Sequence, residues 1–127
     1  MKRSLTGLPI ATLLAAACAS SGPPVPPAQT TEAEAAIRGA ENAGAPVGAS
    51  DLLDRSRRAL AAARQAIAQG NNEEAANQLA EAKAFAAAAE ARARAENVKR
   101  QAAEARRQAD ELESKTKQLQ ERARPSN

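Results

Sequence analysis

The chain has 127 residues, of which 36 are alanine, and its one aromatic side chain is Phe85. A sandwich, barrel or α/β fold needs β-branched and aromatic side chains to fill its sheets, so this composition predicts an all-α protein. With no histidine and one cysteine, the chain lacks the parts of a Cys/His metal site, a Ser-His or Cys-His nucleophile pair and a disulfide framework.

The net charge of +3 comes partly from the first residues. Without Lys2 and Arg3 the chain has 16 basic and 15 acidic residues. Nucleic-acid binding depends on clustered Lys and Arg and on aromatic side chains that stack on bases, and this chain has neither feature. We expect no nucleic-acid partner, no cofactor, no metal and no small-molecule substrate.

Residues 1–17 have the features of an export signal. A charged start precedes the apolar run Leu8–Ala17, which is too short to span a hydrocarbon core of ~30 Å. The run continues as L-L-A-A-A-C-A-S and resembles a bacterial lipobox, although Ala15 stands where a large apolar residue is usual. The resemblance implies that Cys18 becomes the N-terminus and carries a diacylglycerol and a further acyl chain. The alternative is ordinary cleavage after Ala19, which removes the cysteine.

Residues 18–30 are predicted to form the lipid anchor and a spacer. The stretch S-S-G-P-P-V-P-P-A-Q contains four prolines, which favour an extended, semi-rigid chain. In lipoproteins of this kind an Asp directly after the lipidated cysteine retains the protein in the inner membrane. Ala19 occupies that position here, so the resemblance implies the outer membrane, with the chain facing the periplasm.

Residues 31–97 are expected to form an alanine-rich helical domain that opens with a short helix. Thr31 and Glu34 have the spacing of a capping box, which predicts that the helix begins at Thr31. The helix is expected to end near Gly44, which would be the left-handed residue after its last turn, with Pro46 just beyond.

A helical hairpin with a tight Gly-Asn-Asn turn follows. Its first helix is expected from Ser50 or Asp51 to Gln69, with Gly70 in the left-handed conformation that ends a helix. Capping by Asn71 and Glu74 would start the second helix. The apolar stripe of the first helix consists of Leu53, Ser56, Leu60, Ala63 and Ile67. On its solvent side we expect the i,i+4 ion pairs Asp51–Arg55 and Asp54–Arg58.

The second helix of the hairpin is expected to be very long, because no Gly or Pro interrupts the sequence before Ala123. At 1.5 Å per residue it would measure ~78 Å, against ~28 Å for its partner, which leaves ~50 Å without an intrachain neighbour. Small residues recur along it in steps of four and three. This stripe consists of Ala75, Leu79, Ala82, Ala86, Ala89 and Ala93.

Part of the hairpin is similar to a tetratricopeptide-type helix pair, in which small residues let two helices cross closely. The residues that carry this similarity are Ala59, Ala63, Ala66, Gly70, Ala75, Leu79 and Ala82. Repeat arrays need about three units to bury a core, and the chain has no second copy. We therefore expect a single hairpin rather than a solenoid.

Residues 34–95 also resemble a family of small bacterial envelope lipoproteins with a helical domain of unknown function. The similarity rests on the A-G-A-P break at Ala43–Pro46 and on the hairpin L-L-D-R-S-R-R-A-L-A-A-A-R-Q-A-I-A-Q-G-N-N-E-E-A-A-N-Q-L-A-E-A-K-A. In that family the domain occurs alone or ahead of an OmpA-like domain, which we do not expect here. The resemblance implies no activity and no site residue besides Cys18.

Residues that could carry chemistry are expected to lie on solvated helix faces. Glu73-Glu74 and Asp110-Glu111 belong to such faces, so we do not expect an enzyme. Phe85 is expected to close the hairpin core rather than to anchor a partner. Further i,i+4 ion pairs are expected along the long helix: Glu90–Arg94, Glu96–Arg100, Glu111–Lys115 and Glu113–Lys117.

Residues 98–127 are expected to extend the long helix and to fray at the end. Their apolar series consists of Val98, Ala102, Ala105, Ala109, Leu112, Thr116, Leu119 and Ala123. In a parallel homodimer its flanking positions give no opposite-charge pair, so a monomer or weak association is expected. The sequence thus favours a lipid-anchored structural or interaction protein with a possible envelope partner. The alternative is a protein whose long basic helix lies on the membrane surface.

Overall fold

The computed structural model describes residues 22–124, and within this range the protein is all-helical, as predicted. Cys18, the signal segment 1–17 and the tail 125–127 lie outside the described residues. The helices are α1 (Pro27–Asn42), the one-turn α2 (Ala45–Gly48), α3 (Ser50–Ala68) and α4 (Asn72–Ala123). The predicted hairpin is the α3–α4 pair, and its second helix has 52 residues.

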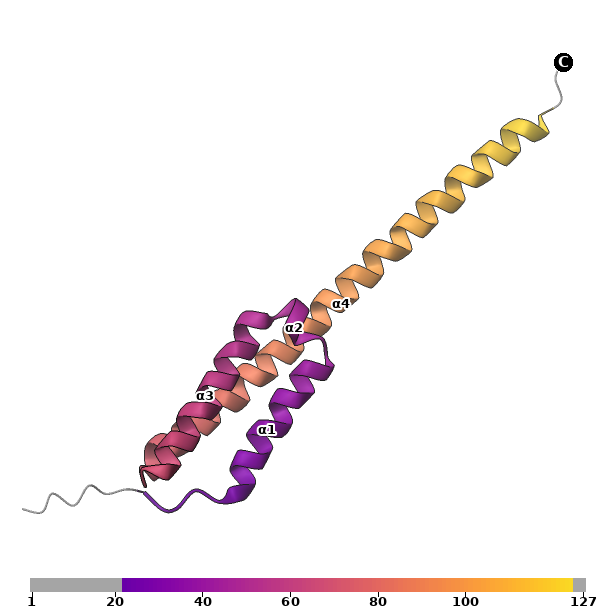
Figure 1. The fold of residues 1–127 in the computed structure, drawn as a ribbon. Coiled ribbons are helices and arrows are strands. Elements are labelled where there is room, and N and C mark those ends of the chain that lie inside the picture. Colours follow the sequence, from indigo (N-terminus) through magenta and orange to yellow (C-terminus); the bar gives the residue numbers. More distant parts are fainter. Residues whose placement is uncertain (1–21, 125–127) are drawn as a thin grey trace, which may run out of the picture.

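α1, α3 and the first half of α4 lie side by side as a three-helix bundle (Figure 1). Ion pairs between helices give the directions. Glu34 and Glu41 of α1 bind Arg64 and Arg57 of α3, in reversed order along the chain, so these two helices are antiparallel. α1 therefore runs parallel to α4 and packs against it. The short first helix is thus a full member of the bundle.

The start of α1 differs from the prediction, because the helix begins at Pro27 rather than at Thr31. The ring of Pro27 fixes a helical φ, and its missing N–H costs nothing at the first position of a helix. Thr31 therefore lies one turn inside, where its hydroxyl donates to the Pro27 carbonyl at 3.3 Å. The capping box at Thr31 and Glu34 was wrong, and the spacer ends at Pro26 instead of residue 30.

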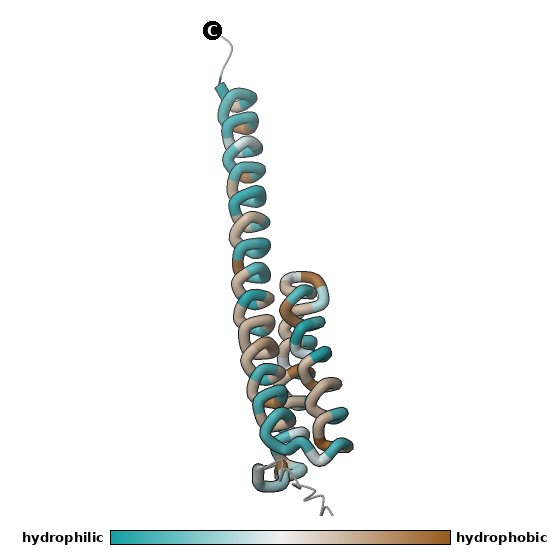
Figure 2. The backbone as a smooth tube through the Cα atoms, turned by 90° about the vertical axis from the view of Figure 1, so that its left-hand side faces the viewer, coloured by the Kyte–Doolittle hydropathy of each residue, from teal (hydrophilic) through white to brown (hydrophobic). Residues whose placement is uncertain are grey.

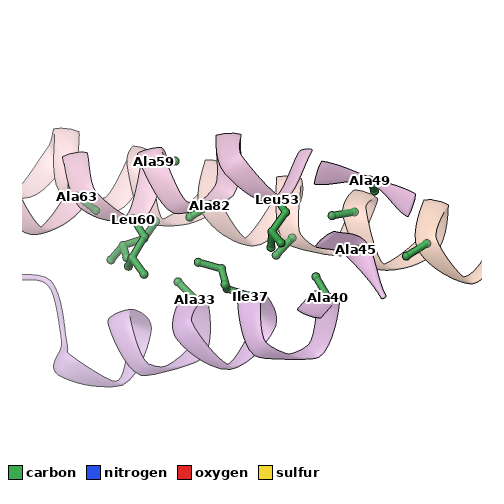
Figure 3. Close-up of a cluster of buried hydrophobic side chains, with 14 residues drawn as sticks. Ala33, Ile37, Ala40, Ala45, Ala49, Leu53, Ala59, Leu60, Ala63 and Ala82 are labelled. Atoms are coloured by element: carbon green, nitrogen blue, oxygen red, sulfur yellow. The ribbon is translucent and has the colours of Figure 1, made fainter. Parts of the chain in front are cut away.

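The core is built mainly from alanine (Figure 3). The stripe predicted for α4 is buried at every position, and of the seven residues that carry the similarity to a tetratricopeptide-type helix pair, all except the turn residue Gly70 are buried as well. Alanine on both sides lets α3 and α4 lie close together. The Ser56 hydroxyl, fully buried, donates to the Ala82 carbonyl of α4 at 2.7 Å.

Two apolar residues lie outside the core, against the prediction. Ile67 is 38% exposed, because the contact line of α3 passes through Ala59, Ala63 and Ala66 instead. Phe85 is half-buried and does not belong to the core cluster. Leu53, Leu60 and Ile67 of the predicted stripe are spaced by seven residues, and this spacing marks the core only as far as Leu60.

Beyond residue 97, α4 continues without a neighbour (Figures 1 and 2). We call residues 98–123 the overhang; all of them are exposed, and they span ~39 Å. The predicted ~50 Å was too long, because the end of α1 and the turn α2 also cover α4. A Cβ added to Gly48 of α2 would lie 3.1 Å from the Ala93 Cα, and Asn97 donates to the Ala43 carbonyl at 3.0 Å.

Candidate functional site

The proline-rich segment before α1 is bound to the end of the bundle at which α4 begins. The Asn72 side chain donates to the Gly22 carbonyl at 2.9 Å, and Val25 packs against the core cluster. The segment and the first turns of α4 enclose an open hollow of about 400 Å³. Residues 22–26, which we call the strap, therefore lie against the protein rather than extending freely as a spacer.

The predicted lipidation residue, Cys18, precedes the strap by four residues. Gly22 itself lies beside the first turn of α4, since a Cβ built there would be 3.9 Å from the Glu73 amide nitrogen. The described part of the chain therefore begins beside the start of α4.

Both turn glycines adopt the left-handed conformation that the sequence predicted for them. Gly44 has φ 90° and separates α1 from α2, whereas Gly70 has φ 73° and separates α3 from α4. L-residues pay ~1–2 kcal/mol in this region, which explains the glycines. The predicted cap at Asn71 is absent, because its side chain makes no cap hydrogen bond and the neighbouring Asn72 binds the strap instead.

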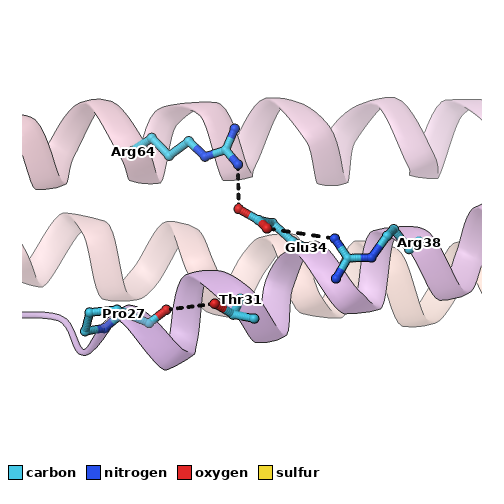
Figure 4. Close-up of polar contacts among 5 residues, drawn as sticks. All are labelled: Pro27, Thr31, Glu34, Arg38 and Arg64. Atoms are coloured by element: carbon cyan, nitrogen blue, oxygen red, sulfur yellow. Dashed lines mark hydrogen bonds and ion pairs between the residues drawn. The ribbon is translucent and has the colours of Figure 1, made fainter.

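Acidic residues of α1 and α3 bind basic residues of other helices across the surface of the bundle. Glu34 bridges Arg64 of α3, at 2.6 Å, and Arg38 of its own helix, at 3.8 Å (Figure 4). Glu32 binds Lys83 of α4 at 3.2 Å. These exposed pairs each contribute ~0–1 kcal/mol, so they fix the register of the helices more than they stabilise the fold.

The ion pairs predicted within α3 were wrong. Asp51 pairs with Arg92 of α4 at 3.1 Å, and Asp54 pairs with Arg57, because these cations lie closer than Arg55 and Arg58. In α4 the pairs Glu90–Arg94, Glu111–Lys115 and Glu113–Lys117 are confirmed.

Glu96 was predicted to pair with Arg100 and pairs with Lys99 instead, at 2.8 Å. This hydrogen bond and the charge of Lys99 lower the pKa of Glu96 below its ordinary value. The side chain is a carboxylate at neutral pH, and the contact weakens as the pH falls through that lowered pKa.

The acidic pairs considered as catalytic candidates lie on exposed helix surface. Glu73 and Glu74 occupy the first turn of α4, and Asp110 and Glu111 belong to the overhang. Within residues 22–124 no three side chains of His, Cys, Asp or Glu are grouped so that they could hold a metal ion. These carboxylates have the positions of solvated surface groups.

Phe85 lines a shallow groove between α3 and α4. The guanidinium of Arg55 stacks over its ring, with the Cζ atom 5.7 Å from the ring centre. Cations in this position are attracted to the ring face by ~0.5–1 kcal/mol at an exposed site. The contact covers the ring and ties α3 to α4 outside the core.

The overhang carries the largest set of exposed apolar side chains. Val98, Leu112 and Leu119 are each 64% exposed, and alanines fill most positions between them on the same side of the helix. No helix in the described part of the chain is apolar over a stretch long enough to cross a bilayer. The overhang and the strap, at opposite ends of α4, are therefore the two candidate functional regions.

Comparisons with known proteins found no relative of this chain. No protein-family model matches the chain, and no curated protein and no solved structure is similar to it. The resemblance to envelope lipoproteins stays a prediction from the sequence.

Proposed function

We propose that the chain is a lipid-anchored helical protein of the bacterial cell envelope, with a structural or interaction role on the periplasmic side of the outer membrane. The sequence support is the chain's one cysteine, placed where an apolar run ends in small residues. A lipid on Cys18 with several acyl chains would anchor the chain stably, since one chain alone binds membranes only marginally.

The observation that carries the proposal is the contact between the strap and α4. Asn72 holds the Gly22 carbonyl at the first turn of α4, four positions after Cys18 in the sequence. The overhang begins after Asn97, so an anchor close to the strap would lie at the opposite end of α4, a helix of ~78 Å, from the exposed apolar surface. In this arrangement the bundle would stand near the membrane and the overhang would be presented to a partner.

Metabolic labelling with a palmitate analogue in a bacterial host tests the anchor. We expect the wild type to carry the label and to fractionate with the outer membrane. The variant Cys18→Ser should carry no label and appear in the soluble fraction. A wild type that is exported without label would contradict the proposal and support cleavage after Ala19.

The alternative is a protein whose overhang lies on the membrane surface. Its specific support is the exposed stripe of Val98, Leu112 and Leu119 together with the basic side chains around it. Interfacial helices have larger and more numerous apolar side chains, including Trp and Phe, so we favour the first function. Co-sedimentation with anionic vesicles should leave the Cys18→Ser protein in the supernatant, whereas binding through the overhang would carry it into the vesicle pellet.

A further inference from the structure

The apolar side of the overhang faces away from the bundle. It consists of Val98, Ala102, Ala105, Ala109, Leu112, Thr116, Leu119 and Ala123, which we call the seam. Successive residues of a helix are turned by about 100°, which places the seam about 130° around α4 from the buried stripe 75–93. A second helix could therefore lie along the whole seam without meeting α1, α2 or α3.

We propose that the seam is covered by the seam of a second copy of this chain, running antiparallel. In an antiparallel pair centred between Asp110 and Glu111, large and small side chains alternate across the contact. The facing pairs are Val98 with Ala123, Leu112 with Ala109, Leu119 with Ala102, and Ala105 with Thr116 of the second copy. Val98, Leu112 and Leu119 thus each face an alanine of the second copy. This alternation lets the helices approach closely and still fills the space between them.

A parallel pair in register fits less well. Each residue would then face the same residue of the second copy. Alanine would face alanine at residues 102, 105 and 109, which would leave the space between the helices unfilled. Arg94 and Lys99, which flank the seam in heptad positions g and e, would also meet across the contact and repel each other.

Charge favours one antiparallel register. In an antiparallel pair, each edge of the seam faces the same edge of the second copy. Arg106 of each copy therefore faces Glu113 of the other, which gives two opposite-charge pairs. On the other edge the polar Gln101 and Gln108 meet basic residues, and no like charges are opposed. A shift by one heptad in either direction would place Arg106 opposite Arg106, or Glu113 opposite Glu113, of the second copy, so that like charges face each other. It also ends the match between the two overhangs, which in the favoured register pair from residue 98 to residue 123.

The resulting dimer is a rod of ~117 Å with a bundle at each end, because two α4 helices of ~78 Å overlap over ~39 Å. The pairing goes beyond the proposed function and does not depend on lipidation. If both copies are anchored through Cys18, the two anchors lie at opposite ends of the rod, as in a strut attached to membrane at both ends.

Sedimentation equilibrium of the full chain as Cys18→Ser, between 1 and 200 µM at low salt, tests the pairing. The chain mass is 13.1 kDa, and we expect the mass to rise to twice this value over the range. R106E replaces two attractions by two repulsions and should raise the dissociation constant at least about tenfold. The double variant R106E/E113R should restore it to within about threefold.

R107E is the matched control, because Arg107 carries the same charge one residue along and lies on the opposite side of the helix from the seam. It should change the dissociation constant less than about threefold. A monomer at 200 µM would overturn the proposal. An R107E effect as large as that of R106E, or a failure of E113R to rescue, would do the same.

Spin-label distances test the orientation. Ser114 and Glu121 both lie on the side of the helix away from the seam, and each is replaced by cysteine in the Cys18→Ser protein. An antiparallel pair puts the two copies of residue 114 ~10 Å apart along the axis and those of residue 121 ~31 Å apart. The distance at 121 should therefore be clearly the longer one, whereas equal distances would indicate a parallel pair and overturn the proposal.

Discussion

Single alanines determine how closely the helices of this protein approach. Ala93 of α4 leaves so little room that a Cβ at Gly48 would lie 3.1 Å from its Cα. Larger residues at such positions would push the two helices apart, so that the neighbouring side chains of both helices would lose their contacts. A core with few large side chains is therefore stable only because its small ones lie at the contact positions.

The two glycines Gly70 and Gly39 should respond in opposite directions to the same substitution. A Cβ at Gly70 meets nothing within 4 Å, so Gly70→Ala tests only the φ of 73° and should cost ~1–2 kcal/mol of unfolding free energy. Gly39 lies inside α1, where its Cβ would be in ordinary contact with Glu90, so Gly39→Ala should stabilise by up to ~1 kcal/mol. Urea unfolding measures both; equal effects would mean that the turn at Gly70 is not strained.

The residues that the sequence predicted correctly share one property: their place follows from spacing alone. The stripe from Ala75 to Ala93 and the breaks at Gly44 and Gly70 are local patterns, and the structure has them. Thr31, Asn71 and Ile67 were misread because competing contacts decide their roles. Pro27 takes the start of α1, Asn72 binds the strap, and a row of alanines replaces Ile67 at the contact.

At the scale of elements, α3 and α4 are joined by one buried polar contact. Ser56 donates to the Ala82 carbonyl, which also accepts the backbone bond of its own helix. Ser56→Ala should therefore cost only ~0.5–1.5 kcal/mol, because no buried group is left without a partner. The contact fixes the level at which the two helices meet rather than supplying most of the stability.

Enlarging Ser56 tests how close this contact is. Ser56→Leu inserts bulk into a fully buried site and should destabilise by ~1–3 kcal/mol, more than Ser56→Ala. Thermal and urea unfolding give the comparison. The control Ser114→Leu places the same side chain on the exposed overhang and should leave the bundle's stability unchanged; a stable Ser56→Leu protein would show that α3 and α4 have room between them.

At the scale of the molecule, the sequence predicted the elements better than their assembly. The hairpin and the long helix follow from periodicity, whereas the docking of α1 and the strap depends on contacts between distant residues such as Gly22 with Asn72 and Glu32 with Lys83. No spacing rule connects residues fifty positions apart. The docking of the predicted semi-rigid spacer was missed for this reason, and the overhang was predicted too long because the end of α1 and α2 also contact α4.

The bundle and the overhang should behave as separable parts. In residues 22–124, no ion pair and no side-chain hydrogen bond joins the overhang to α1, α2 or α3, so a chain ending after Gln101 keeps every such contact of the bundle. At 1 µM its melting temperature should lie within about 3 °C of the full chain's, with a smaller helical signal. At the same micromolar concentration the isolated peptide 98–127 should be monomeric and only partly helical, because it must form its own helix nucleus, which the bundle otherwise supplies. A fully helical peptide would mean that the overhang does not need the bundle as its nucleus, and a truncated chain that melts more than about 8 °C lower would mean that the overhang stabilises the bundle.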